Sequence, residues 1–73
     1  LGPRMSLKLL REGCGKTQVD VSEAAGMAQG DVSKLEQRED AKMSTLRRYV
    51  EALGGELELV VTFKTGHRMR IEL

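Results

Sequence analysis

The sequence predicts a mainly α-helical fold, with about four short helices followed by a C-terminal β-hairpin. Three observations predict it. Apolar residues recur at intervals of three and four between residues 5 and 53, as on the buried side of a helix. Glycines separate most of these segments. From residue 56 onward, apolar and polar residues alternate, which is typical of strands. We therefore expect a helical domain over 5–53 and a hairpin over 54–73.

Polar residues and glycines delimit the first two helices. The first is predicted over about 5–12 and ends at the sequence Gly-Cys-Gly over 13–15. The second is predicted to begin after Thr17, because a threonine hydroxyl caps helix N-termini well, and to end at Ala25.

The stretch from Thr17 to Glu36 is typical of two helices joined by a tight turn. Gly26 stands where the chain must turn left-handed, which glycine does without steric penalty. The third helix is predicted from residue 28 or 29 to about 37.

The inward positions are Val21, Val32 and Leu35, and the outward ones are Gln29, Gly30, Asp31, Ser33, Lys34 and Gln37. This helix-turn-helix layout predicts binding to double-stranded DNA, whereas an ordinary helical hairpin would not need so many small residues at once.

A fourth helix follows a polar connector over 37–42. It is predicted over 45–53 with Ser44 as its N-cap. Its apolar residues recur at helical spacing and are Leu46, Val50 and Leu53, with Tyr49 beside them. Two glycines at 54–55 end it.

The hairpin has a predicted register. A three-residue loop over 64–66 places Gly66 where a left-handed residue is needed. It pairs Val61 with Met69, Leu59 with Ile71 and Leu57 with Leu73, whereas a two-residue loop would mix apolar and polar faces. An isolated hairpin is marginal in water, so we expect it to pack on the helices, a second copy or a partner. Pairing across a two-fold axis would form a homodimer. The residues assigned to dimerisation are Leu57, Leu59, Val61, Phe63, Met69 and Ile71.

Composition narrows the classes of function. The 12 Lys and Arg residues nearly balance the 11 Asp and Glu residues, so attraction to DNA must come from local clustering of charge. Aromatic residues are almost absent, which argues against a stacking platform for single-stranded nucleic acid. The single cysteine, Cys14, fits a reducing cytoplasm, and no apolar run is long enough to span a membrane. No catalytic pairing or metal-ligand cluster is evident, so we expect no enzyme, metal or cofactor.

The start of the chain does not look native. Residues 1–4 read Leu-Gly-Pro-Arg, and Gly-Pro is similar to a tag-cleavage remnant. We expect these residues to be a tag remnant or a disordered end, and the chain to be part of a longer protein.

Specific residues resemble a known family. The residues that carry the resemblance are Thr17-Gln18, Gly26-Met27, Gln29 and the run from Asp31 to Glu36, which are similar to the lambda-repressor-like, XRE-type helix-turn-helix domain. Residues 44–59 resemble its HigA-type antitoxin subgroup and, more distantly, the HipB antitoxins. The resemblance implies a dimeric transcriptional repressor on a palindromic operator that controls its own gene and that of a toxin. A module that neutralises a toxin with little DNA binding and a stand-alone phage-like repressor stay open as alternatives.

The resemblance also implies residue roles. Base contacts are expected from Gln29, Ser33 and Lys34, with Gln29 bidentate to adenine. Phosphate contacts are expected from Thr17, Gln18, Arg38, Lys42, Ser44 and Thr45. Solvated surface charge is the alternative role for Arg38, Lys42, Arg47 and Arg48, and only their clustering in space would favour a functional role.

Four residues depart from the family pattern or oppose phosphate binding. Lys16 stands where an apolar residue is usual. Gly30 removes one side chain that could read DNA and costs roughly 1 kcal/mol of helix stability relative to alanine. Asp31 would repel phosphates but suits a helix N-terminus. Glu36 has the same charge conflict, and we expect it to hold the loop that follows it.

Overall fold

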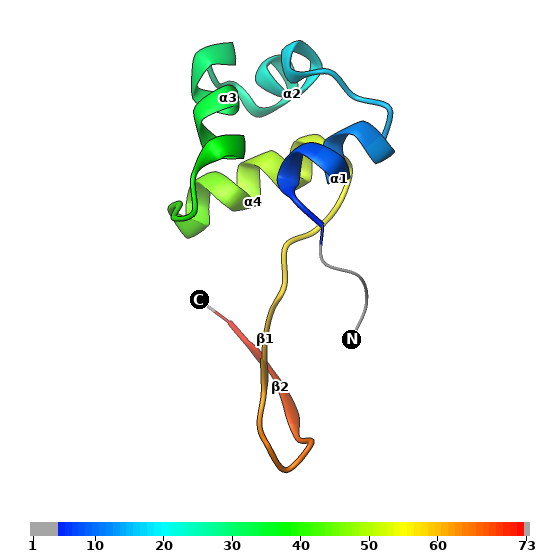
Figure 1. Ribbon diagram of the computed structural model, residues 1–73, viewed down its shortest axis with the longest axis vertical. Helices are drawn as coiled ribbons and strands as arrows, with labels where there is room; N and C mark the ends of the chain where they lie inside the picture. The colour runs from blue at the N-terminus through cyan, green and yellow to red at the C-terminus, as the bar shows by residue number, and fades with distance from the viewer. Residues whose placement is uncertain (1–4, 73) are drawn as a thin grey trace.

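The computed structural model describes residues 5–72, and Figure 1 shows four helices packed into one body from which a hairpin projects. The expectations for residues 1–4 and for the pairing of Leu57 with Leu73 lie outside the described residues. The elements are α1 (Leu7–Gly13), α2 (Gln18–Ala25), α3 (Gln29–Gln37), α4 (Met43–Ala52), β1 (Leu59–Thr62) and β2 (Arg68–Ile71). The predicted mainly α-helical fold with a C-terminal hairpin is confirmed.

Side-chain caps fix the start of the first two helices. The Ser6 hydroxyl accepts the backbone N–H of Leu9 at 3.2 Å, so α1 begins directly after Ser6. Thr17 Oγ1 accepts the N–H of Asp20 at 3.0 Å, and Asp20 Oδ2 accepts the N–H of Thr17 at 2.8 Å. This reciprocal capping box satisfies two N–H groups that the helix leaves free. The predicted Thr17 cap is confirmed, and Asp20 is its partner.

The fourth helix begins earlier than predicted. Lys42 is its N-cap, with φ −64° and ψ 140°, and the Lys42 carbonyl accepts the N–H of Leu46 at 3.0 Å. Ser44 therefore lies inside the first turn, and its predicted role as N-cap is wrong. Tertiary packing explains the difference, because Ala41 packs against the core and the chain turns into the helix just after it.

The core is small and has a tyrosine at its centre. Its buried hydrophobic residues are Val21, Val32, Leu35 and Tyr49. Half-buried residues surround them: Leu7, Met27, Ala41, Leu46, Ala52 and Leu53. Tyr49 was expected beside the apolar stripe of α4, but its side chain is fully buried. Val50 instead packs on the turn after α4, where its Cγ1 would lie 3.2 Å from a Cβ at Gly55, so glycine permits that close approach.

The hairpin has the predicted register. Val61 pairs with Met69 and Leu59 with Ile71. Gly66 closes the loop with φ 92°, the left-handed conformation that its position requires. The strands are shorter than the alternating pattern, because β2 ends at Ile71 and no strand of the described residues pairs with residues 56–58.

The apolar face of the hairpin is only partly covered in the single chain, where Leu59 and Val61 are half-buried. Phe63, Met69 and Ile71 are 50%, 61% and 44% exposed. Figure 1 shows the hairpin extending away from the helices, which do not cover this face. An isolated two-stranded sheet is marginal in water, so this face is a candidate for contact with another chain.

Candidate nucleic-acid interface

The turn between α2 and α3 is held from both sides. Gly26 has φ 65° and donates its N–H to the carbonyl of Ser22. From α4, Arg48 Nη2 donates to the carbonyl oxygens of Ala25 at 2.7 Å and Gly26 at 3.0 Å. A cation at the C-terminal carbonyls of a helix is stabilising. Arg48 is thus a cap of the turn, a role that its sequence position did not indicate.

The third helix has a core face and a solvent face. Val32 and Leu35 are buried, and on the remaining surface lie the exposed or half-buried residues Gln29, Gly30, Ser33, Lys34 and Gln37. A Cβ at Gly30 would meet nothing within 4 Å, so this position is open. The three residues predicted to contact bases therefore share the accessible part of α3.

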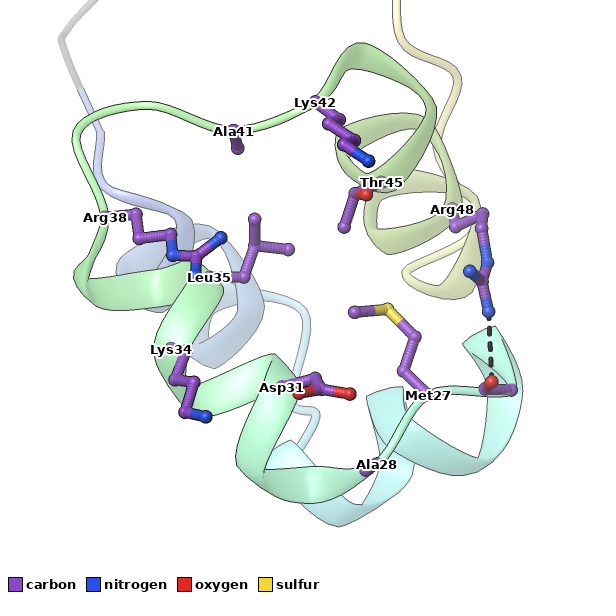
Figure 2. A pocket seen from close by; sticks show the side chains of 11 residues that line it. Met27, Ala28, Asp31, Lys34, Leu35, Arg38, Ala41, Lys42, Thr45 and Arg48 are labelled. Atoms are coloured by element: carbon purple, nitrogen blue, oxygen red, sulfur yellow. Dashed lines mark hydrogen bonds between the residues drawn. The ribbon is translucent and has the colours of Figure 1, made fainter.

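A groove of about 390 Å³ lies between the α2–α3 turn, α3 and the start of α4 (Figure 2). Four basic side chains line it: Lys34, Arg38, Lys42 and Arg48. Figure 2 shows Met27 and Asp31 facing Lys42 and Thr45 across the groove. The groove concentrates positive charge on a chain whose net charge is only +1, which is the local clustering that DNA binding requires.

The other residues predicted to contact phosphate lie in two places. Thr17 and Gln18 stand at the start of α2, and Ser44 is exposed in the first turn of α4 beside Thr45, which lines the groove. Gln18 is half-buried, and its Nε2 donates to Glu36 Oε1 at 3.2 Å. The residues predicted to contact phosphate therefore divide between the N-terminus of α2 and the groove with the adjoining first turn of α4.

A buried charged network lies beneath α3. The side chains of Arg11 and Glu36 are 9% and 4% exposed. Arg11 Nε donates to Glu36 Oε2 at 2.7 Å, and its Nη2 donates to Oε1 at 3.1 Å, the two-pronged geometry that arginine forms with carboxylates. Glu36 was expected to hold the loop after α3, but it binds inside the helical body instead.

The network reaches every helix. The Tyr49 hydroxyl of α4 lies 2.7 Å from Glu36 Oε2 and 3.0 Å from the carbonyl oxygen of Leu7. Arg11 Nη1 donates to the carbonyl of Lys16 at 2.9 Å. With the bond from Gln18, the network joins all four helices and the α1–α2 loop. Breaking such a pair leaves a charge buried and unpaired, which is costly.

Hydrogen bonds outweigh burial in setting the charge of Glu36. Burial disfavours its ionised form, but hydrogen bonds from Arg11, Tyr49 and Gln18 lower its pKa below the ordinary value of 4.5. Burial, together with the bond to Glu36, raises the pKa of the Tyr49 hydroxyl. The hydrogen bond to Glu36 raises the pKa of Arg11. At neutral pH the network is therefore an ion pair with a neutral phenol.

Residues 5–72 lack the groups that a clustered metal site or a membrane-spanning helix would need. No three His, Cys, Asp or Glu side chains of this range are grouped so that they could hold a metal ion. No helix in the same range has the length and apolar character to cross a membrane. The basic groove and the solvent face of α3 form the candidate nucleic-acid interface of the described residues.

The fold and this surface agree with known proteins. The profile of a helix-turn-helix domain family matches residues 5–63. The chain belongs to this helix-turn-helix family. The putative antitoxin HigA2 of Mycobacterium tuberculosis is 44% identical over 57 residues, which are 75% of this chain and 56% of that protein. Antitoxin HigA1 of the same species is 41% identical over 61 residues, 82% of this chain and 41% of that protein. The chain spans about half the length of these curated relatives.

Solved structures of the helix-turn-helix family extend the similarity over the whole chain. A HigA antitoxin, studied for induced DNA bending by unique dimerization, is 32% identical with a TM-score of 0.85, covering 100% of this chain and 99% of that chain. A DNA-bound antitoxin HigA3 is 32% identical with a TM-score of 0.86, covering 99% and 95%. The predicted resemblance to the HigA-type antitoxins is confirmed, as is the predicted fold.

Proposed function

We propose that the chain is a sequence-specific, double-stranded DNA-binding repressor, the antitoxin of a toxin–antitoxin system that represses its own operon. One observation carries the proposal: Lys34, Arg38, Lys42 and Arg48 line a groove beside the open face of α3. Basic side chains that neutralise phosphates release counterions and dominate DNA affinity. An exposed polar helix beside such a cluster suits insertion into a major groove.

Base readout is assigned to the open face of α3. Gln29 at its start is exposed and can bond N7 and N6 of adenine with one amide. Ser33 and Lys34 follow one turn later and contact base edges or the adjacent backbone. The open space at Gly30 lets α3 approach the base edges in the major groove of the DNA closely.

Phosphate contacts are assigned to both sides of α3. On one side, Thr17 and Gln18 stand at the N-terminus of α2, where helix N–H groups favour anions. On the other side are the groove residues and the first turn of α4, namely Arg38, Lys42, Ser44 and Thr45. Contacts on two strands of the backbone fix the register in which α3 reads bases.

Two copies are proposed to bind one operator through their hairpins. The contact face consists of Leu57, Leu59, Val61, Phe63, Met69 and Ile71. Three of these residues, Phe63, Met69 and Ile71, are exposed in the single chain, which supports the assignment. The similarity to a HigA antitoxin studied for its dimerization supports it too. The two recognition helices would lie about 34 Å apart, one turn of the duplex.

The antitoxin role follows from the curated relatives. Both are named HigA antitoxins, and the matched region is about half of each. A cognate toxin protein is therefore the proposed second partner, and the cytoplasm, where DNA and toxin are both accessible, is the proposed location. No catalytic reaction, metal or cofactor is assigned to the chain.

Fluorescence anisotropy tests the proposal directly. A labelled duplex from the region upstream of the gene is titrated with the protein at two salt concentrations, with a scrambled duplex of equal length as the control. The proposal expects selective binding whose affinity falls steeply with salt. Equal, weak binding to both duplexes would overturn it and favour a protein that only neutralises a toxin.

A further inference from the structure

The side chain of Gln18, at the edge of the proposed DNA surface, is hydrogen-bonded to a buried carboxylate. It is the first residue of α2 and is half-buried. Its Nε2 donates one hydrogen bond, of 3.2 Å, to Glu36 Oε1. A glutamine amide carries two N–H groups, so a second donor remains for a ligand.

The acceptor of this bond is immobilised. Glu36 Oε1 also accepts from Arg11 Nη2 at 3.1 Å, while Oε2 accepts from Arg11 Nε and from the Tyr49 hydroxyl, each at 2.7 Å. Its side chain is 4% exposed. Three hydrogen bonds from α1 and α4 therefore hold the carboxylate in position independently of Gln18.

The charge of Glu36 does not oppose DNA binding. A bare carboxylate near phosphates would repel them, but the guanidinium of Arg11 pairs with it in a two-pronged contact. The pair is neutral as a unit, and it is nearly closed to solvent. Glu36 can therefore hold Gln18 without adding a negative charge to the surface.

We propose that Glu36 is a positioning residue for DNA binding: it holds the Gln18 amide so that its second N–H meets one defined phosphate. This rests on the proposed function. A free glutamine side chain must be ordered when it binds, and ordering one such side chain weakens binding by roughly 2- to 10-fold. Holding the amide before DNA binds removes that loss of affinity. It also links the buried network around Glu36 to the phosphate contact made by α2.

Duplexes that carry one neutral methylphosphonate test the link at a single phosphate. Each phosphate of the operator is replaced in turn, and the ratio of modified to unmodified Kd is measured for the wild type, Gln18→Ala and Glu36→Gln. One position should weaken wild-type binding several-fold and leave Gln18→Ala unaffected. Glu36→Gln should lose most of the sensitivity to the methylphosphonate at that same position. The double variant, Gln18→Ala with Glu36→Gln, should lose no more of this sensitivity than Gln18→Ala alone.

Tyr49→Phe is the matched control. It removes a donor to Oε2 but leaves the bond from Gln18 to Oε1, so it should keep the wild-type sensitivity at the Gln18-dependent phosphate. A merely structural role for Glu36 predicts that Glu36→Gln and Tyr49→Phe weaken binding at every phosphate alike. That pattern, or full sensitivity in Glu36→Gln, would overturn the inference while leaving the proposed function intact.

A second measurement needs no variant and covers the case in which Glu36→Gln fails to fold. The NMR order parameter of the Gln18 side-chain amide in the free protein should approach that of rigid backbone, about 0.85. The exposed side chain of Gln37 should be far more mobile. Equal mobility of Gln18 and Gln37 would overturn the inference. If the wild type showed no selective binding to the operator duplex, the proposed function would be overturned, and the inference with it.

Discussion

The guanidinium of Arg48 caps the last carbonyls of α2: its Nη2 lies 2.7 Å from the oxygen of Ala25 and 3.0 Å from that of Gly26. The contact spans 23 residues of sequence and fixes α4 against the turn of the helix-turn-helix. The same side chain lines the basic groove. One arginine thus stabilises the turn and contributes charge to the proposed DNA surface.

Arg48→Ala should destabilise the fold. It removes a cation from the C-terminus of α2 and leaves carbonyls of the turn without that donor, so the free energy of unfolding should fall by about 1 kcal/mol. The melting temperature should fall by about 4–8 °C, measured by circular dichroism. Arg47→Ala is the control, because the Arg47 side chain makes no hydrogen bond or ion pair with other described residues, and it should change stability by less than about 0.5 kcal/mol.

Local signals in the sequence were sufficient for most of the fold. The Thr17 cap, the left-handed Gly26 and the alternation around the 64–66 loop each depend on neighbouring residues, and each is confirmed. The predicted start of α4 was wrong, because the packing of Ala41, a tertiary contact, determines where this helix begins. Boundaries that depend on packing are not encoded in the local pattern.

The buried network was missed for a related reason. Arg11 falls one helical turn after Leu7, and Glu36 one turn after Val32, so both charges lie on apolar faces. Two opposite charges at such positions are a signal for a buried pair. The sequence alone could not pair them, because they are 25 residues apart. The clustering of basic residues in the groove likewise depends on how α4 docks.

Alanine should have opposite effects at two glycines of the helix-turn-helix. At Gly30 the backbone is helical and a Cβ meets nothing within 4 Å, so Gly30→Ala should raise the free energy of unfolding by about 0.5–1 kcal/mol. At Gly26, φ is 65°, and Gly26→Ala should lower it by roughly 1–2 kcal/mol. Urea unfolding of both variants measures the difference. Equal destabilisation at both sites would contradict an open helical position at Gly30.

The stability of the fold should decline in acid through Glu36. Its pKa is lower in the folded chain than its ordinary value of 4.5, because its hydrogen bonds outweigh burial. The folded state therefore binds that proton less tightly than the unfolded chain, and the stabilisation is present above pH 4.5 and lost as the pH falls through the folded pKa. Urea unfolding at a series of pH values measures this slope.

Variants of the same network separate the contribution of Glu36. Glu36→Gln should be less stable than the wild type at pH 7, by about 3 kcal/mol, because it leaves Arg11 buried without its counter-charge. It should also show a shallower acid slope. Tyr49→Phe removes one of three donor side chains and should give an intermediate slope. An unchanged slope in Glu36→Gln would show that other carboxylates carry the acid sensitivity.

Ile71→Lys should convert the proposed dimer into a monomer. The side chain lies on the apolar hairpin face, and a charge there would be buried without a partner in a dimer. Sedimentation velocity over a range of concentrations measures the assembly, and operator affinity should fall roughly 100-fold when the two half-sites are no longer linked. Thr62→Lys, on the opposite face of the same hairpin, should remain dimeric. A dimeric Ile71→Lys would refute dimerisation through this face.

Gln29→Ala should relax sequence discrimination at one base pair of each half-site. Loss of a bidentate amide contact reduces discrimination by about 1–3 kcal/mol at that position and leaves the others unchanged. Competition binding with operators mutated one base pair at a time measures this.

Lys42→Ala, from the basic groove, should instead weaken binding to every duplex alike and reduce the salt slope by about 1. Lys64→Ala, at the hairpin tip, should change neither quantity. If Gln29→Ala kept the wild-type preference at every position, base readout by the start of α3 would be excluded, and Ser33 and Lys34 would have to supply the specificity.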